Sequence, residues 1–105
     1  MRAKASKLKR DASHRAKKKG LPFDLTLDWI VERLELGVCA RTGTPFQLSI
    51  HNPDAPSLDK INPAGGYTMD NTQVVTWRYN YCKQQGTDEE LYQFCSDLVQ
   101  HVERR

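Results

Sequence analysis

The chain has 105 residues, with 16 Lys and Arg against 13 Asp and Glu, and a formal net charge of +3. This length allows one domain with a thin core, and no apolar run approaches the roughly 20 residues of a membrane span. The basic start is not followed by the apolar stretch of a secretory signal. We therefore expect a cytoplasmic protein with no membrane partner.

The charge is divided unevenly along the chain. Residues 1–20 hold nine basic residues and one acid, giving +8, whereas residues 21–105 hold seven basic residues and twelve acids, giving −5. Such an asymmetry indicates a polyanionic partner. We expect residues 1–20 to be a solvated basic arm, with Leu8 as its only large apolar residue, in front of a single domain over residues 21–105. The alternative is a charged tail that only keeps the protein soluble.

If the arm binds nucleic acid, its affinity comes from phosphate contacts and depends strongly on salt. The arm residues expected to make these contacts are Lys4, Lys7, Lys9, Arg10, Arg15, Lys17, Lys18 and Lys19.

The three cysteines, Cys39, Cys82 and Cys95, are odd in number and widely spaced. Neither a disulfide framework nor the paired spacing of a four-thiolate zinc site is present. We expect buried thiols that pack as small apolar residues. A zinc site built from Cys39 and His51 would lack two ligands, so no structural zinc is expected.

The body predicts short elements in the order helix, strand, strand, helix, helix, which is an α+β fold. Thr26 caps a predicted helix over residues 27–34. Strands are expected over residues 46–50 and 57–61. A helix capped by Asp70 or Asn71 should run over residues 72–83, and a capping box at Thr87 and Glu90 should open the last helix. That last helix has an apolar stripe made of Leu91, Phe94, Cys95, Leu98 and Val102.

Polar residues around the predicted strand end and helix suggest phosphate chemistry. The carboxylate of Asp59 is a hard oxygen donor suited to Mg²⁺, and Asn80 offers a carbonyl oxygen from the facing helix. Asn71 is placed to orient a catalytic group or water by hydrogen bonding. Gln73, Thr76, Asn80 and Lys83 form a polar stripe on the predicted helix; for Gln73 and Thr76 a solvated face is the better interpretation.

Residues 57–84 read SLDKINPAGGYTMDNTQVVTWRYNYCKQ. This stretch resembles the HNH nuclease family, also called ββα-metal or His-Me finger nucleases. Its pattern is an Asp-His pair at a strand end, then Pro and Gly, an Asn-Leu at the start of the helix and a later His or Asn. Here DKI at residues 59–61 with Pro63, NTQVV at residues 71–75, and Asn80 with Lys83 take these places. With GVCARTGTPF at residues 37–46, the resemblance covers roughly residues 37–84 and is closest to small phage-encoded HNH-like proteins.

The resemblance implies a ββα-metal finger, flanked by an N-terminal helix and a C-terminal amphipathic helix. It implies an endonuclease that hydrolyses or nicks double-stranded DNA with one divalent cation, Mg²⁺ or Mn²⁺. Asp59 and Asn80 would ligate the metal, Lys60 would occupy the base position and Asn71 would orient the site. The body residues expected to contact DNA are Arg41, Arg78 and Lys83. A phage origin would place the protein in the host cytoplasm.

Lys60 departs from the family, whose general base is a His at this position. An ordinary lysine is protonated at neutral pH and is a poor base. Three interpretations stay open: a lysine with a lowered pKa acts as base, a charged lysine stabilises the transition state, or the site is inactive. His51 is a second candidate base, although a turn residue is the commoner role; His14 suits phosphate contact, and His101 suits a helix C-terminus.

Three functions are therefore compared. The first is the HNH-type endonuclease, and the second is a catalytically inactive DNA-binding or regulatory protein with the same fold. The third is a protein-interaction module that uses the acidic last helix, with Asp88, Glu89, Glu90 and Asp97. The sequence leaves open whether the protein is a monomer or a homodimer.

Overall fold

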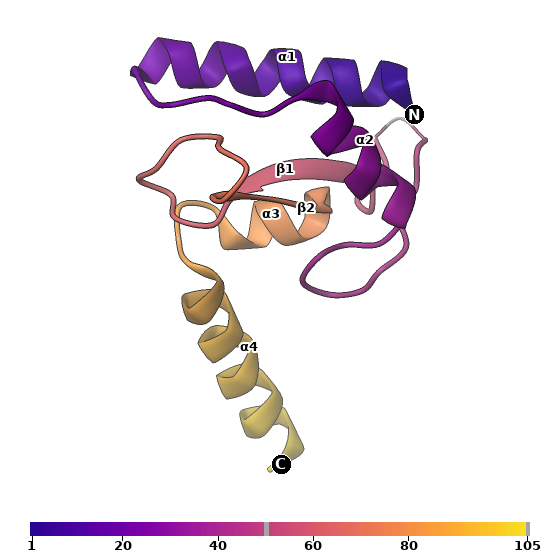
Figure 1. Cartoon of the computed structure of the whole chain (residues 1–105). Coiled ribbons are helices and arrows are strands. Elements are labelled where there is room, and N and C mark those ends of the chain that lie inside the picture. The colour runs from indigo at the N-terminus through magenta and orange to yellow at the C-terminus, as the bar shows by residue number, and fades with distance from the viewer. Residues whose placement is uncertain (50, 105) are drawn as a thin grey trace.

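The computed structural model describes residues 1–49 and 51–104. This part of the chain contains four helices and one two-stranded antiparallel sheet (Figure 1), so the predicted α+β class is confirmed. In the same residues, no helix is long and apolar enough to cross a membrane. The elements are α1 (Arg2–Lys19), α2 (Leu27–Leu36), β1 (Pro56–Lys60), β2 (Thr72–Thr76), α3 (Trp77–Lys83) and α4 (Asp88–Glu103).

The centre of the fold is a β-hairpin followed directly by a short helix. β1 pairs with β2 so that Asp59 lies opposite Gln73 and Lys60 lies opposite Thr72. The hydroxyl of Thr76, the last residue of β2, accepts a hydrogen bond from the backbone N–H of Tyr79 and thereby caps α3. α3 then packs against both strands. This ββα unit places one strand end and one helix face side by side.

The predicted helix over residues 72–83 is wrong in its first half, because residues 72–76 form β2. The segment reads TQVVT and is rich in β-branched residues, which favour a strand. All five of its residues are buried, so the alternation that marks a half-buried strand is absent. The predicted strand over residues 46–50 is also wrong as far as the structure describes it. Residues 46–49 lie in no strand, and Ile50 lies outside the described residues.

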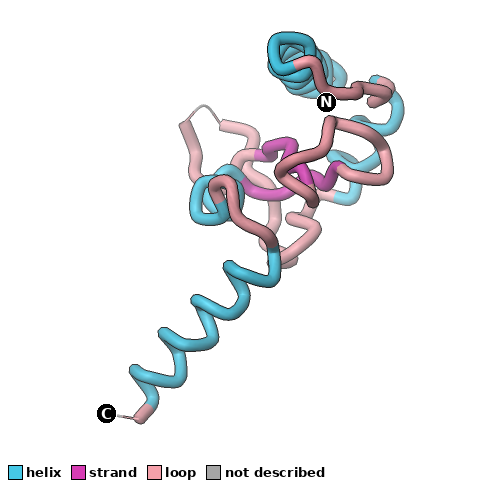
Figure 2. Tube along the Cα trace, turned by 90° about the vertical axis from the view of Figure 1, so that its left-hand side faces the viewer, coloured by secondary structure: helices cyan, strands magenta, loops and turns pink. Residues whose placement is uncertain are grey.

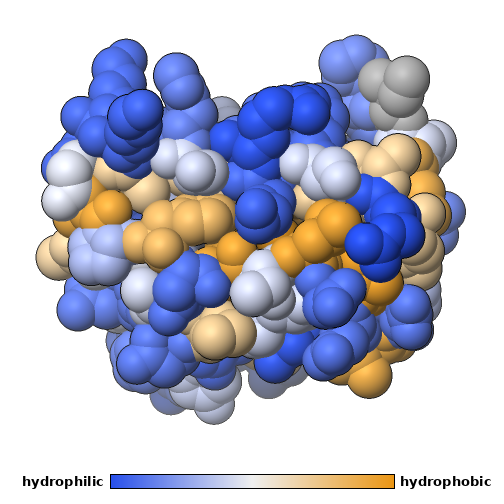
Figure 3. Space-filling model, turned by 45° about the horizontal axis from the view of Figure 1, so that its top comes forward, coloured by the Kyte–Doolittle hydropathy of each residue, from blue (hydrophilic) through white to orange (hydrophobic). Residues whose placement is uncertain are grey.

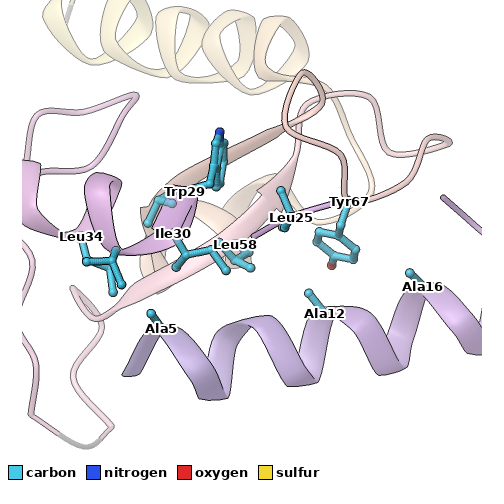
Figure 4. Packing of buried hydrophobic residues seen from close by; sticks show 11 residues of the cluster. Ala5, Ala12, Ala16, Leu25, Trp29, Ile30, Leu34, Leu58 and Tyr67 are labelled. Atoms are coloured by element: carbon cyan, nitrogen blue, oxygen red, sulfur yellow. The ribbon is translucent and has the colours of Figure 1, made fainter. Parts of the chain in front are cut away.

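The basic segment at the start is a docked helix and not a solvated arm. Ala5, Ala12 and Ala16 are spaced at i, i+7 and i+11 and are at most 1% exposed. They face the core, where Leu58 and Tyr67 meet α1 (Figure 4). Because alanine has a small side chain, the α1 backbone approaches the core without a stripe of large apolar residues. The prediction of an undocked arm is wrong because it considered only large apolar residues and not this face of small ones.

The remaining two helices, α2 and α4, begin where the sequence predicts. The Thr26 hydroxyl caps α2, and the capping box of Thr87 and Glu90 opens α4. α4 leaves the body at its first turn and projects away from it (Figures 1 and 2). Of the three cysteines only Cys39 is buried, so the expectation of three buried thiols is wrong for Cys82 and Cys95.

Candidate nucleic-acid interface

A cavity of about 160 Å³ opens where the end of α1, the end of β1 and α3 meet. Its walls include Asp59, Lys60 and Asn80, three residues for which the sequence predicted a role at one site. The ββα geometry explains this meeting, because β1 ends where α3 packs against it. Arg15 and Lys19 from α1 complete the rim.

Three cations, Arg15, Lys19 and Lys60, line this cavity, and two of them share one aromatic ring. Arg15 donates a hydrogen bond from Nε to the Tyr67 hydroxyl at 3.2 Å, and its guanidinium carbon lies 5.3 Å from the ring centre. The ammonium of Lys60 lies 5.5 Å from the same ring centre and donates to the Pro63 carbonyl at 3.0 Å. The face of an aromatic ring attracts cations. Tyr67 therefore helps to hold two positive side chains at the mouth of the cavity.

The pKa of Lys60 is lowered from its ordinary value. Burial is the main cause, and the positive charges of Lys19 and Arg15 add to it, while Asp59 opposes the shift. Burial and neighbouring positive charges disfavour the charged ammonium, whereas a neighbouring carboxylate favours it. An anion placed among the three cations would relieve their repulsion, so the cavity suits a phosphate group.

The carboxylate of Asp59 is already paired with a lysine. Lys83 donates from Nζ to Asp59 Oδ2 at 2.7 Å and to the Lys60 carbonyl at 2.8 Å, with a side chain that is 0% exposed. Gln73 donates from Nε2 to the same Asp59 oxygen at 2.9 Å. A buried charge needs such partners. Lys83 therefore cannot contact DNA phosphate from the surface, and that prediction for Lys83 is wrong.

A divalent cation does not fit the donors as they are arranged. Asp59 Oδ2 is neutralised by Lys83, and Asn80 directs its amide N–H groups at the Ser57 hydroxyl and the Leu58 carbonyl. In residues 1–49 and 51–104, no group of three His, Cys, Asp or Glu side chains is placed to hold a metal. Hard cations prefer several oxygen donors, whereas this cavity is rimmed by positive charges.

Asn71 holds the loop between the two strands and does not begin a helix. Its Oδ1 accepts the backbone N–H of Asn62 at 2.9 Å, and its Nδ2 donates to the carbonyls of Asn62 and Gly66 at 3.2 and 2.8 Å. The loop is packed against the chain ahead of α2, since a Cβ at Gly66 would lie 2.1 Å from the Pro22 carbonyl oxygen. Asn71 thus positions the loop that carries Tyr67 and Pro63.

The other predicted contact residues are spread over different faces. Arg41 pairs with Asp88 at 3.0 Å, and Arg78 pairs with Asp54 at 3.2 Å. Both arginines line a separate groove beside α4, away from the cationic cavity. Lys7, Arg10, Lys17 and Lys18 are exposed on α1. Hydrophilic side chains project from the upper part of the molecule, above a band of apolar side chains that crosses the view (Figure 3).

None of the three histidines lines the cationic cavity in the described chain. His51 lies in a separate hollow beside Lys4 and Trp77. His14 is exposed on α1 and His101 is exposed in the last turn of α4.

Three residues of this region were expected at the surface but are buried. Gln73 and Thr76 were expected on a solvated face, yet they are 8% and 2% exposed because they belong to β2. Asp88 was expected on an acidic surface, but it accepts hydrogen bonds from Tyr79 and Gln73 and is 7% exposed. Tyr67 was also missed, and no sequence signal marks its contact with Arg15, 52 positions away.

No protein-family model matches the chain, and neither a curated protein nor a solved structure gives a significant match.

Proposed function

We propose that this protein binds double-stranded DNA through its phosphates and uses an HNH-like finger for binding without cutting. The observation that carries the proposal is the convergence of Arg15, Lys19 and Lys60 on one cavity beside the basic helix α1. Phosphate contacts supply most of the sequence-independent affinity of proteins for DNA. The cavity would take one phosphate group while the exposed lysines of α1 contact its neighbours.

The pairing of Asp59 favours binding over cleavage. The HNH resemblance assigns this carboxylate to a metal ion, but here a buried ammonium lies 2.7 Å from it. Lys60 stands in the base position, and its charge serves a phosphate contact directly. Lys60 and Lys83 thus favour a protein that shares the finger fold and DNA binding with the HNH family but does not share its cleavage chemistry.

A metal-dependent DNA endonuclease is the second candidate. It is favoured by one observation, that Asp59, Lys60 and Asn80 line the same cavity. It requires Lys83 and Gln73 to release Asp59 to Mg²⁺ or Mn²⁺. The lowered pKa of Lys60 also suits a base better than an ordinary lysine would.

Two assays separate the candidates. The first measures the affinity of a short DNA duplex of arbitrary sequence by fluorescence anisotropy. Lys60→Ala and Arg15→Ala should each weaken binding by about 1 kcal/mol or more, as expected for a charge-assisted contact. Arg104→Gln removes one positive charge from the far end of the molecule and is the matched control. Equal effects of all three variants would contradict the phosphate cavity.

The second assay incubates supercoiled plasmid with the protein in Mg²⁺ or Mn²⁺. We expect a mobility shift without nicking for the wild type. Nicking that is lost in Asp59→Asn, while circular dichroism shows that this variant still folds, would support the endonuclease instead. Nicking gained in Lys60→His would show a site that lacks only its base.

A further inference from the structure

We propose that α4 is a self-association helix, through which two copies of this chain pair in an antiparallel arrangement. This inference is independent of DNA binding, because α4 projects from the body while the cationic cavity lies beside α1 (Figure 1).

The apolar face of α4 is exposed from Tyr92 to Val102. Leu98, Val99 and Val102 are 55%, 50% and 45% exposed, and Tyr92 and Phe94 are 76% and 67% exposed. At 100° per residue, these side chains and Leu91 lie on one side of the helix. A single exposed apolar residue is ordinary, but a continuous face of this kind marks an interaction site.

This face continues into a groove of about 930 Å³. Leu91, Phe94 and Leu98 form one wall of the groove, and Tyr79 and Cys82 of α3 belong to the opposite side. The exposed α4 side chains supply on the order of 500 Å² of apolar surface per copy. Two copies would bury at most about 1,000 Å² through these side chains, which is close to the roughly 1,200 Å² at which specific interfaces begin, and contact with the groove walls would add to it.

The charges of α4 favour a second copy as the partner. Glu90, Asp97, His101 and Arg104 follow one another at steps of seven, four and three residues, so they form one stripe beside the apolar face. The stripe is acidic in its first part and basic at its end. In an antiparallel pair, Glu90 near the start of each helix faces His101 and Arg104 near the end of the partner helix. Asp97 lies close to the two-fold axis, and the two helix dipoles run in opposite directions, which is their favourable arrangement. The two ends of the stripe are therefore complementary to each other.

A membrane surface fits α4 less well. Helices that lie on membranes carry lysines and arginines on their polar face, where they meet anionic lipids. The polar face of α4 carries Glu89, Asp97 and Glu103 instead. Anionic lipids would repel it.

The first test follows the mass of the full chain by sedimentation velocity from about 5 to about 500 µM, a range that reveals micromolar association. We expect the mass to rise toward that of a dimer. Leu98→Ser should weaken dimerisation by at least about tenfold, whereas the control Gln93→Ser, on the opposite face, should leave it unchanged. Circular dichroism confirms that both variants fold. A wild-type protein that stays monomeric, or two variants with equal effects, would overturn the proposal.

The second test uses Cys95, which lies at the middle of the 16-residue α4. In a symmetric antiparallel pair that overlaps along the whole of α4 the two midpoints meet, so a short bismaleimide should link Cys95 to its copy. The link should form in Cys82→Ser and be lost in Cys95→Ser. In Cys82→Ser/Cys95→Ser/Val102→Cys the reactive thiol is moved to the end of α4. In an antiparallel pair the two Val102→Cys thiols would then lie roughly 20 Å apart along the axis. Efficient linking of that variant would overturn the antiparallel arrangement.

Discussion

Asp59 and Lys83 form the buried ion pair on which the centre of the fold depends. Both side chains are at most 5% exposed, and Gln73 adds a hydrogen bond to the same carboxylate oxygen. The pair joins the end of β1 to the last residue of α3. It thereby fixes how the strand end and the helix meet beside the cationic cavity.

Lys83→Met should lower the free energy of unfolding by about 3–5 kcal/mol, because it leaves the buried Asp59 charge without its counter-ion. Asp59→Asn/Lys83→Met should recover most of that loss, since neither charge is then buried. Urea denaturation followed by circular dichroism measures both variants. Lys7→Met is the control, because the ion pair of Lys7 with Asp11 is exposed. A similar loss in Lys83→Met and Lys7→Met would contradict the structural role of the pair.

Lys60 should make DNA binding depend on pH within an unusual range. Its pKa is lowered by burial, Lys19 and Arg15, so its ammonium loses a proton at lower pH than an ordinary lysine. Phosphate binds the charged form, so affinity should fall as pH rises through this lowered pKa. Anisotropy measurements across the alkaline range follow the decline, which should begin at lower pH than for an ordinary lysine.

Lys60→Arg is the control for this pH dependence. Arginine keeps its charge throughout the range, so its affinity curve should be flatter than that of the wild type. Identical curves for the two proteins would show that Lys60 does not contact the bound phosphate.

The individual site residues were predictable where neighbours in sequence decide their position. Asp59, Lys60 and Asn80 were assigned to one site from the motif that contains them, and they line one cavity, although the local signals predicted a strand over residues 46–50 and missed β2. The partners of Asp59 were not predictable, since Lys83 is 24 positions away and its burial depends on the packing of α3. Lys83 looks like a surface lysine in the sequence for that reason.

At the scale of elements, the decisive feature is the close docking of α1. Its buried face consists of three alanines, so α1 has no large apolar stripe that the sequence would reveal. The start of β2 was misassigned for a related reason. Both faces of that strand are buried, and the resulting pattern does not alternate. The capped helices α2 and α4 were predictable, because their signals are local and independent of packing.

Ala12→Leu should loosen the docking of α1. Ala12 is 0% exposed, so the larger side chain must displace the helix from the core, at a cost of about 1–3 kcal/mol. Thermal unfolding followed by circular dichroism detects this as a lower melting temperature. The same substitution at the exposed Ala3 is the control and should change stability by less than about 0.5 kcal/mol. An unchanged melting temperature in Ala12→Leu would indicate an undocked α1.

At the scale of the whole molecule, the two ends differ in character. The end with α1 carries the exposed lysines and the cationic cavity, and the end with α4 carries apolar and acidic side chains. The near-neutral total charge of the chain therefore conceals a strongly polarised molecule, with overall dimensions of 47 × 30 × 22 Å.

The affinity for duplex DNA should fall steeply with salt if α1 contacts phosphates. Each lysine that contacts a phosphate adds about 0.9 to the slope of log affinity against log salt. Lys17→Ala/Lys18→Ala should therefore reduce the slope by about 2 and weaken binding equally for different DNA sequences. Anisotropy titrations from about 50 to about 200 mM salt give the slope. A slope equal to that of the wild type would exclude these two lysines from the interface.

The placement of α1 and α4 at opposite ends has a consequence for a paired molecule. In one chain α1 lies across the end of the body opposite α4 (Figures 1 and 2), so an antiparallel α4 pair would place the two basic helices at its far ends. Such a dimer could not clamp one duplex from both sides. It would bridge two duplexes, or two distant sites on one, and draw them together. Looping of a long tethered DNA by the wild type, but not by Leu98→Ser, would reveal this bridging.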